Sequence, residues 1–215
     1  MINLYNTDCM PALANMKDNA YDLAIVDPPF GIGIDKKANN NANVKFNKSA
    51  TYCKDYGVKE WDSSTPDEIY FEELKRVSKD QIIWGANYFG LKGGYIYWHK
   101  FVTMPTYSDG ELAYCSKING LKYIGMAWHG MIQHDMKNKE ARIHPTQKPV
   151  ALYKWLLKNY AKEGDKILDT HGGSMSIAIA CHDLKFDLDL WEIDEDYYKA
   201  GVKRFNQHKA QLTIF

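Results

Sequence analysis

The 215-residue sequence has no run of apolar residues long enough to cross a membrane. A membrane-spanning helix needs about 18 or more such residues in succession. The N-terminus also lacks the basic and then apolar pattern of a secretory signal. Together these absences predict a cytoplasmic protein with no membrane partner.

Cysteine is scarce, and its four positions are scattered. No two cysteines form a Cys-x-x-Cys pair, which argues against both a zinc site and a disulfide framework. We expect reduced, partly buried thiols and predict no metal site. The cysteines are Cys9, Cys53, Cys115 and Cys181.

The chain also lacks net charge, with 27 basic and 27 acidic residues, so its overall charge gives no support to nucleic-acid binding. The distribution is uneven, because six lysines stand against three acids between Asp35 and Glu60. This stretch is either a loop that contacts phosphates or a merely solvated loop. The lysines are Lys36, Lys37, Lys45, Lys48, Lys54 and Lys59, of which the first four are the candidates for DNA contact.

The length suits one α/β domain, which we place at residues 1–210, followed by a short tail at 211–215. Residues 31–60 lose all periodicity and carry an Asn-rich segment, which predicts a mobile polar insertion. Before it, the pattern predicts a strand at 2–5, a helix at 10–16 and a strand at 23–26. The last of these is an apolar run stopped by two prolines, typical of a buried parallel strand that delivers a loop at its carboxyl end.

The rest of the chain alternates strands and helices. We predict a helix at 68–77 and strands at 81–84, 94–98, 111–115 and 123–128. After a polar segment at 129–143, a helix is expected to start near Pro149 and to end at Gly164. The last fifty residues predict a βαβα unit with strands at 166–169 and 186–192 and helices at 176–182 and 195–208.

The turn Gly172-Gly173-Ser174 after the strand that ends at Asp169 has the features of a nucleotide-type site. Glycines allow a ligand to approach the backbone, and Glu192, at the end of the next strand, can accept both hydroxyls of a ribose. An ordinary tight turn and a solvated strand end remain the alternatives.

The tetrapeptide Asp27-Pro28-Pro29-Phe30 suits a reaction in which an amine attacks a methyl sulfonium. The Asp27 carboxylate and the Pro28 carbonyl can accept hydrogen bonds from the amine and orient it, and Pro29 stiffens the turn. Phe30 can stack on an extruded base. The alternative is a plain proline turn after a strand.

These motifs, together with His144-Pro145-Thr146-Gln147-Lys148-Pro149 between them, resemble the DNA amino-methyltransferases of the β type, in which the catalytic segment precedes the cofactor segment. The resemblance covers nearly the whole chain. It implies a Rossmann-like class I methyltransferase fold, α/β with a mostly parallel sheet and a permuted motif order. It also implies S-adenosylmethionine as cofactor and double-stranded DNA as partner.

The resemblance assigns residues as well. Asp27 to Phe30 become the catalytic motif. Asp8 matches a cofactor-adenine contact, although it can equally be a helix N-cap. The remaining cofactor-binding candidates are His144, Thr146, Lys148, Asp169, Gly172, Gly173, Ser174 and Glu192.

Similarity to small phage-type members of the family places Asn87, Trp98 and Lys100 on the target side of the cleft, although Trp98 is more typical of a core. Adenine is the favoured target, since cytosine-specific relatives more often carry Ser in place of Asp27. The rivals are a cytosine-amino or RNA methyltransferase and a non-catalytic relative that binds DNA or a clamp.

Two departures from the family pattern matter. The cofactor loop has Thr170, His171 and Met175 where proline, phenylalanine and glycine are usual, which weakens the expectation on cofactor affinity. We assign His171 no catalytic role. The chain also lacks a separate recognition domain, so specificity must come from residues 31–60, from residues 129–143 or from a second subunit.

The C-terminal tail resembles the short peptides with which bacterial DNA enzymes bind the replication sliding clamp. Gln211 would donate or accept a hydrogen bond, and Leu212 and Phe215 would fill an apolar groove. A tail packed on the protein's own surface is the alternative. Among similar enzymes dimers are common, and a homodimer would help so small a chain to grip DNA.

Overall fold

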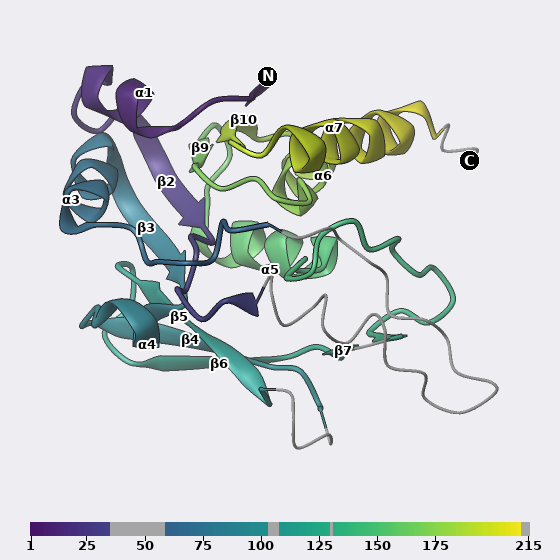
Figure 1. Ribbon diagram of the computed structural model, residues 1–215. Helices are drawn as coiled ribbons and strands as arrows, with labels where there is room; N and C mark the ends of the chain where they lie inside the picture. The colour runs from purple at the N-terminus through teal and green to yellow at the C-terminus, as the bar shows by residue number, and fades with distance from the viewer. Residues whose placement is uncertain (35–58, 103–107, 130, 212–215) are drawn as a thin grey trace.

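The computed structural model describes residues 1–34, 59–102, 108–129 and 131–211, and its centre is one eight-stranded sheet (Figure 1). The strand order is β1-β10-β9-β2-β3-β5-β4-β6. In chain order the strands are β1 (Ile2–Tyr5), β2 (Tyr21–Val26), β3 (Ser78–Trp84), β4 (Gly94–His99), β5 (Gly110–Cys115), β6 (Leu121–Gly125), β9 (Lys166–Asp169) and β10 (Asp187–Trp191).

Within this sheet only β5 runs against its neighbours. It pairs antiparallel with β3 and β4, whereas the other pairs are parallel. The sequence expectation of a mostly parallel α/β sheet of the class I methyltransferase type is therefore confirmed. Because β5 reverses direction, its first residues reach the same edge of the sheet as the carboxyl ends of β2 and β3.

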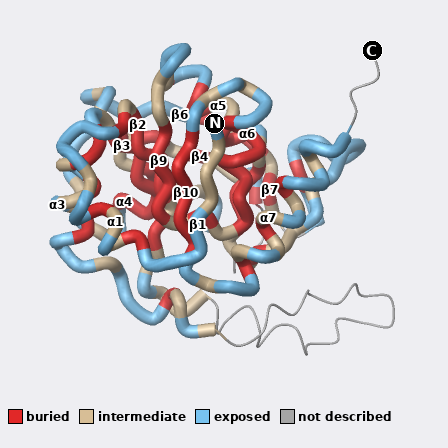
Figure 2. Tube along the Cα trace, turned by 90° about the horizontal axis from the view of Figure 1, so that it is seen from above, coloured by how far each residue is buried: buried red, intermediate tan, exposed pale blue. Residues whose placement is uncertain are grey.

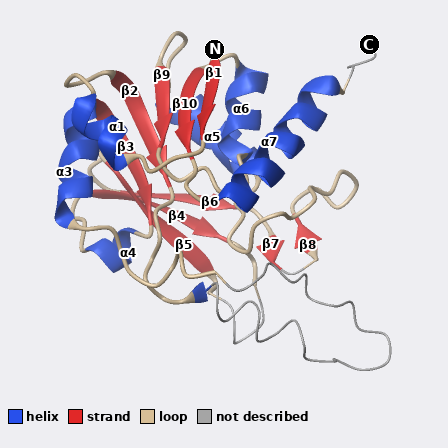
Figure 3. Cartoon of the chain, turned by 45° about the horizontal axis from the view of Figure 1, so that its top comes forward, coloured by secondary structure: helices blue, strands red, loops and turns tan. Residues whose placement is uncertain are grey.

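Helices cover both faces of the sheet (Figure 3). On one face α1 (Met10–Asn15) and α3 (Glu68–Val77) pack on Ala24, Val26 and Ile83. On the other face α5 (Val150–Tyr160), α6 (Ser176–Leu184) and α7 (Glu195–Ala210) form the larger core with Ile25 and Trp84. The central strands are accordingly the most deeply buried part of the molecule (Figure 2).

Local signals explain where several elements begin. The Asp67 carboxylate accepts the N–H of Tyr70 and so caps α3, and the Asp194 carboxylate caps α7 in the same way. Strand β2 is buried over most of its length and ends at Val26, two residues before Pro28, which cannot donate to the ladder.

Two sequence predictions on element bounds were wrong, and one short helix was missed. The strand expected at 123–128 is β6 at Leu121–Gly125, and Trp128 starts a separate hairpin of β7 (Trp128–His129) and β8 (Ile132–Gln133). Helix α5 ends at Tyr160, before Gly164. The four-residue helix α4 (Ala86–Phe89) was not predicted, because two left-handed glycines, Gly85 and Gly90, bound it and hide its periodicity.

The candidate DNA-contacting lysines Lys36, Lys37, Lys45 and Lys48 lie outside the described residues, as do Cys53 and Leu212 to Phe215 of the tail. The other three cysteines are buried free thiols. None of the helices in the described ranges is long and apolar enough to span a bilayer. In the same ranges, no cluster of three or more His, Cys, Asp or Glu side chains could hold a metal ion.

Candidate active site

The carboxyl ends of three adjacent parallel strands bring three acidic residues to one edge of the sheet. Asp27 follows β2, Asp169 is the last residue of β9, and Glu192 follows β10. Open α/β sheets bind ligands at this edge. The structure thus brings together the predicted catalytic tetrapeptide and the predicted cofactor turn, which lie about 140 residues apart in the sequence.

A buried chain of charges surrounds Asp27. The Lys148 ammonium lies 2.5 Å from Asp27 Oδ2 and 2.9 Å from Glu111 Oε2, and its side chain is only 1% exposed. Glu111 also pairs with Lys100, which lies over the Trp98 ring. Two carboxylates and two ammonium groups therefore neutralise each other beside the predicted catalytic motif.

The pKa values in this network move in opposite directions. Burial raises the pKa of Asp27, and Lys148 only partly offsets that effect. Burial would also raise the pKa of Glu111, but Lys100 and Lys148 together lower it to about 2. Burial would lower the pKa of Lys148, yet its two carboxylate partners raise it. Lys148 therefore stays charged.

The two oxygens of the Asp27 carboxylate are in different environments. Oδ1 is buried and has no hydrogen-bond partner among the residues that the structure describes. A buried acceptor without a donor is costly, and native structures keep such atoms mainly where a ligand or function uses them. Asp27 is thus held by Lys148 through one oxygen and offers the other to an incoming donor.

The Phe30 ring is already stacked. Tyr88 lies parallel to it, with ring centroids 4.9 Å apart, and Phe89 meets it edge-on at 6.1 Å. The Lys148 ammonium lies 5.6 Å from the Phe30 centroid. Gly85 must lack a side chain here, because an added Cβ would lie 2.4 Å from the Phe30 ring.

At the cofactor end of the same edge, the acids are held by the backbone. The Glu192 carboxylate accepts the N–H groups of Gly173, at 2.6 Å, and of Asp194, at 2.8 Å. The Asp169 carboxylate accepts the N–H of His171 at 3.0 Å. Burial raises the pKa of Glu192 and raises that of Asp169 to about 8.

His144 lies between two rings, with Trp61 5.0 Å and Tyr197 4.2 Å from it between centroids. Its Nδ1 is 3.1 Å from the Thr146 hydroxyl. Burial lowers the pKa of His144 to about 3 and that of His171 to about 4, so both rings are neutral at pH 7. The two rings therefore contribute packing contacts to the site but no charge.

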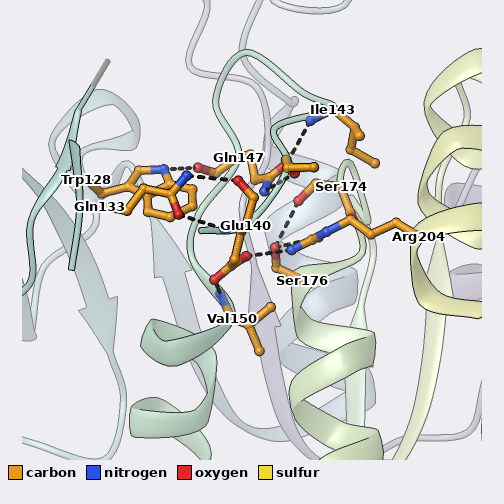
Figure 4. Close-up of polar contacts among 10 residues, drawn as sticks. Trp128, Gln133, Glu140, Ile143, Gln147, Val150, Ser174, Ser176 and Arg204 are labelled. Atoms are coloured by element: carbon orange, nitrogen blue, oxygen red, sulfur yellow. Dashed lines mark hydrogen bonds and ion pairs between the residues drawn. The ribbon is translucent and has the colours of Figure 1, made fainter. Parts of the chain in front are cut away.

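Several residues that sequence reasoning missed support the site. Glu140 accepts the first N–H of α5 and pairs with Arg204, which donates to the Ser174 carbonyl (Figure 4). Gln133 of β8 exchanges two hydrogen bonds with the backbone of Glu140 (Figure 4). The β7–β8 hairpin is in this way tied to the cofactor turn. Asp62 likewise holds the loop after Phe30.

The remaining predicted site residues lie in several different parts of the structure. Asp8 is exposed and its carboxylate accepts the N–H of Met10, but the N-cap of α1 is Cys9, so the N-cap alternative for Asp8 was wrong. Ser174 is buried, with its hydroxyl 3.0 Å from that of Ser176. Asn87 is exposed on α4, whereas Trp98 belongs to the core. Lys148 and Lys100 join the charge network around Asp27.

Comparison with known proteins gives a consistent result. The profile of the DNA methylase family, the N6/N4 methyltransferases, matches residues 68–203. The type II methyltransferase M.HpaI of Haemophilus parainfluenzae is 25% identical over 230 aligned residues, which cover 93% of this chain and 73% of M.HpaI.

Two solved structures share the fold. The complex of M1.HpyAVI with S-adenosylmethionine has a TM-score of 0.55 and 19% identity, covering 95% of this chain and all of that one. The cytosine-N4-specific PvuII DNA methyltransferase has a TM-score of 0.59 and 12% identity, covering 100% of this chain and 88% of the other. At these identities the likeness shows the fold alone.

Proposed function

The chain belongs to the DNA methylase family and is an S-adenosylmethionine-dependent DNA amino-methyltransferase, and from this premise we propose that its target is the 6-amino group of adenine. The catalytic residues in this proposal are Asp27, Pro28, Pro29 and Phe30. M.HpaI is named a type II methyltransferase. For this chain we propose site-specific methylation of double-stranded DNA.

The unpartnered Asp27 Oδ1 supports an exocyclic amine as the target, and the aspartate itself favours adenine, since cytosine-specific relatives more often carry Ser at this position. An exocyclic amine is the kind of donor that this buried acceptor lacks. Because Lys148 fixes the other oxygen from 2.5 Å, the carboxylate cannot easily turn away from the amine. A rigid acceptor orients the amine for in-line attack without reorganising during the reaction.

The cofactor end fits a ligand that carries a cation and a ribose. Glu192 is 8% exposed, whereas its neighbour Ile193 is 65% exposed, so an open apolar side chain stands next to a carboxylate. An added Cβ on Gly173 would meet nothing closer than the His144 ring at 3.8 Å, so space remains above the turn. We assign the cofactor to Asp8, Asp169, Gly172, Gly173 and Glu192, with His144, Thr146 and Ser174 packing around it.

When bound, S-adenosylmethionine supplies the methyl group on a sulfonium. Asp27 Oδ1 accepts a hydrogen bond from the target amine and leaves its nitrogen lone pair directed at the methyl carbon. Transfer would form the nitrogen–carbon bond as the sulfur–carbon bond breaks, and the methylated amine would then give up one proton. Burial raises the pKa of Asp27, which makes this carboxylate the group placed to receive the proton.

The base must leave the duplex to reach Asp27. Phe30 offers the stacking surface for the flipped base, and Tyr88 now occupies a face of that ring. Tyr88 is 45% exposed and lies on a short helix between two left-handed glycines. We therefore expect the Tyr88 ring to move when the base enters.

Three hypotheses remain for sequence recognition: the 31–60 segment, residues 129–143 with β8 and the exposed Met131 and Ile132, and a second subunit. The homodimer and the contact of the tail with a sliding clamp stay predictions.

Methylation-aware sequencing of DNA from cells that express the intact protein or Asp27→Asn tests the proposal. We expect modified adenine at a defined sequence with the intact protein and a loss of kcat of about 10²- to 10³-fold in the variant. Asp22→Asn is the matched control, since Asp22 lies on β2, the strand that Asp27 follows, and pairs with Lys79 at the surface.

Modified cytosine in place of adenine would correct the base. Absence of any modified DNA with the intact protein would reject the function. Equal activity of Asp27→Asn and Asp22→Asn would reject the catalytic assignment.

A further inference from the structure

Asp62 is a buried carboxylate, 1% exposed, that holds the loop following the catalytic motif. Its Oδ1 accepts the N–H of Phe30 at 2.7 Å and that of Gly31 at 2.9 Å. Its Oδ2 accepts the N–H of Ile34 at 2.8 Å, and its carbonyl accepts the N–H of Gly33 at 3.0 Å. One residue therefore satisfies four backbone donors of a five-residue loop.

The N–H groups of this loop find their acceptors outside the loop, on Asp62. Pro28 and Pro29 have no N–H, and Gly31 and Gly33 have left-handed φ values of +70° and +62°. Successive N–H groups in such a turn point inward and form a concave site for an anion. Here the anion is the Asp62 carboxylate.

The segment that carries Asp62 also reaches the cofactor end. Lys59 pairs with Asp194 at 2.9 Å and with Asp196 at 2.7 Å, just after Glu192. Trp61 packs on His144 at 5.0 Å between ring centroids. Residues 59–62 thus connect the loop after Phe30 to the two parts of the chain that border the cofactor turn.

We propose that Asp62 is a positioning residue for methyl transfer, which fixes Phe30 and, through the rigid Pro28-Pro29 turn, the direction of the Asp27 carboxylate. This role rests on the proposed function of Asp27 and Phe30. Asp62 does not touch the reacting atoms in this role. A misplacement of about 1 Å at a reacting group can cost about 100-fold in rate, so loss of the anchor acts on kcat.

The test compares Asp62→Asn and Asp62→Ala with Asp67→Asn in purified full-length protein. Asp67 is the control because its carboxylate also accepts a backbone N–H, that of Tyr70 at 3.0 Å, but at the start of α3. Three quantities are measured: kcat on DNA, the Kd of S-adenosylmethionine, and hydrogen exchange of the amides of Phe30, Gly31 and Ile34.

We expect kcat to fall about 10-fold in Asp62→Asn, which keeps one acceptor oxygen, and about 100-fold in Asp62→Ala. The three amides should lose protection in both variants, and the Kd of the cofactor should change by less than about threefold. Asp67→Asn should keep wild-type kcat and wild-type protection of these amides. Thermal unfolding shows whether the alanine variant is folded, and the asparagine variant carries the test if it is not.

A folded Asp62 variant with kcat within about twofold of wild type would overturn the positioning role. So would a loss of cofactor affinity as large as the loss of kcat, because that pattern is a general structural defect. If the wild-type protein itself transfers no methyl group to DNA, the proposed function fails, and unprotected amides in the variants would then show a purely structural anchor.

Discussion

Asp27 follows β2 and Glu192 follows β10 at the same edge of the sheet, yet the protein holds the two carboxylates in different ways. Asp27 faces an ammonium group, that of Lys148, and shares it with Glu111. Glu192 accepts backbone N–H groups from Gly173 and Asp194. One end is a network of opposite side-chain charges, and at the other the polar contacts come from the backbone turn itself.

The difference matches what each end has to do. A backbone turn leaves its carboxylates able to compensate a positive ligand, which suits a sulfonium cofactor. An internal lysine neutralises Asp27 and fixes its direction before any substrate arrives, which suits the orientation of a neutral amine. The two ends should therefore respond differently to substitution and to pH.

The largest effect is expected from Lys148→Met. This change leaves two buried carboxylates without their shared cation, and the free energy of unfolding should fall by about 3–5 kcal/mol. Lys154→Met is the control, because its partner Asp183 is near the surface and such pairs contribute about 0–1 kcal/mol. Urea unfolding measures the free energy of unfolding of both variants. Equal losses would mean that the buried network contributes no more stability than a surface ion pair.

A smaller and different effect is expected from Glu192→Gln. The Kd of S-adenosylmethionine should rise about 10-fold, since a charged acceptor at the ligand is worth about 1.5 kcal/mol or more. In contrast to Asp27→Asn, kcat at saturating cofactor should stay within about threefold of wild type.

Calorimetric titration with the cofactor measures the Glu192→Gln effect. Glu195→Gln is the matched control, three residues further on and paired with Lys199 at the surface. If both glutamine variants bind the cofactor as wild type does, Glu192 is not a cofactor ligand.

Sequence patterns located the residues at the Glu192 end of this edge better than the partners of Asp27 at the other end. Asp169 and Glu192 were found because each closes an apolar strand in a βαβα unit, so local patterns alone place them side by side. Asp27 was found because it opens the Asp27-Pro28-Pro29-Phe30 turn after an apolar strand. The strand that carries Glu111 was predicted, but nothing local says that β5 reverses and brings Glu111 and Lys100 to Lys148.

Asp62 was missed for a related reason. It follows a stretch without periodicity, and its four partners lie about thirty residues earlier in the chain, so no spacing connects them. Lys148 was predicted to pack around the cofactor, and the structure shows its ammonium in the network around Asp27. The motif was recognised, but the direction of one long side chain depends on tertiary packing.

The smallest effect is a pH dependence that separates the two ends. Burial raises the pKa of Asp169 to about 8, from an unfolded value of about 3.9. Folded Asp169 is therefore protonated where the unfolded chain is not, so its contribution to stability is full below about pH 4 and is lost as the pH rises to about 8. A positive ligand favours the ionised form, so cofactor affinity should change in the opposite direction.

We expect the Kd of S-adenosylmethionine to fall by about threefold to fivefold between about pH 6.5 and about pH 8.5, and Asp169→Asn to remove this slope. Asp189→Asn is the control. Burial would raise the pKa of Asp189, but Lys166 and its other partners lower it, so this sheet aspartate is already ionised across the range. Calorimetric titrations at both pH values measure the Kd of S-adenosylmethionine in each variant. A slope that survives in Asp169→Asn would assign the titration to another group, and no slope in wild type would mean that the cofactor's charge does not reach Asp169.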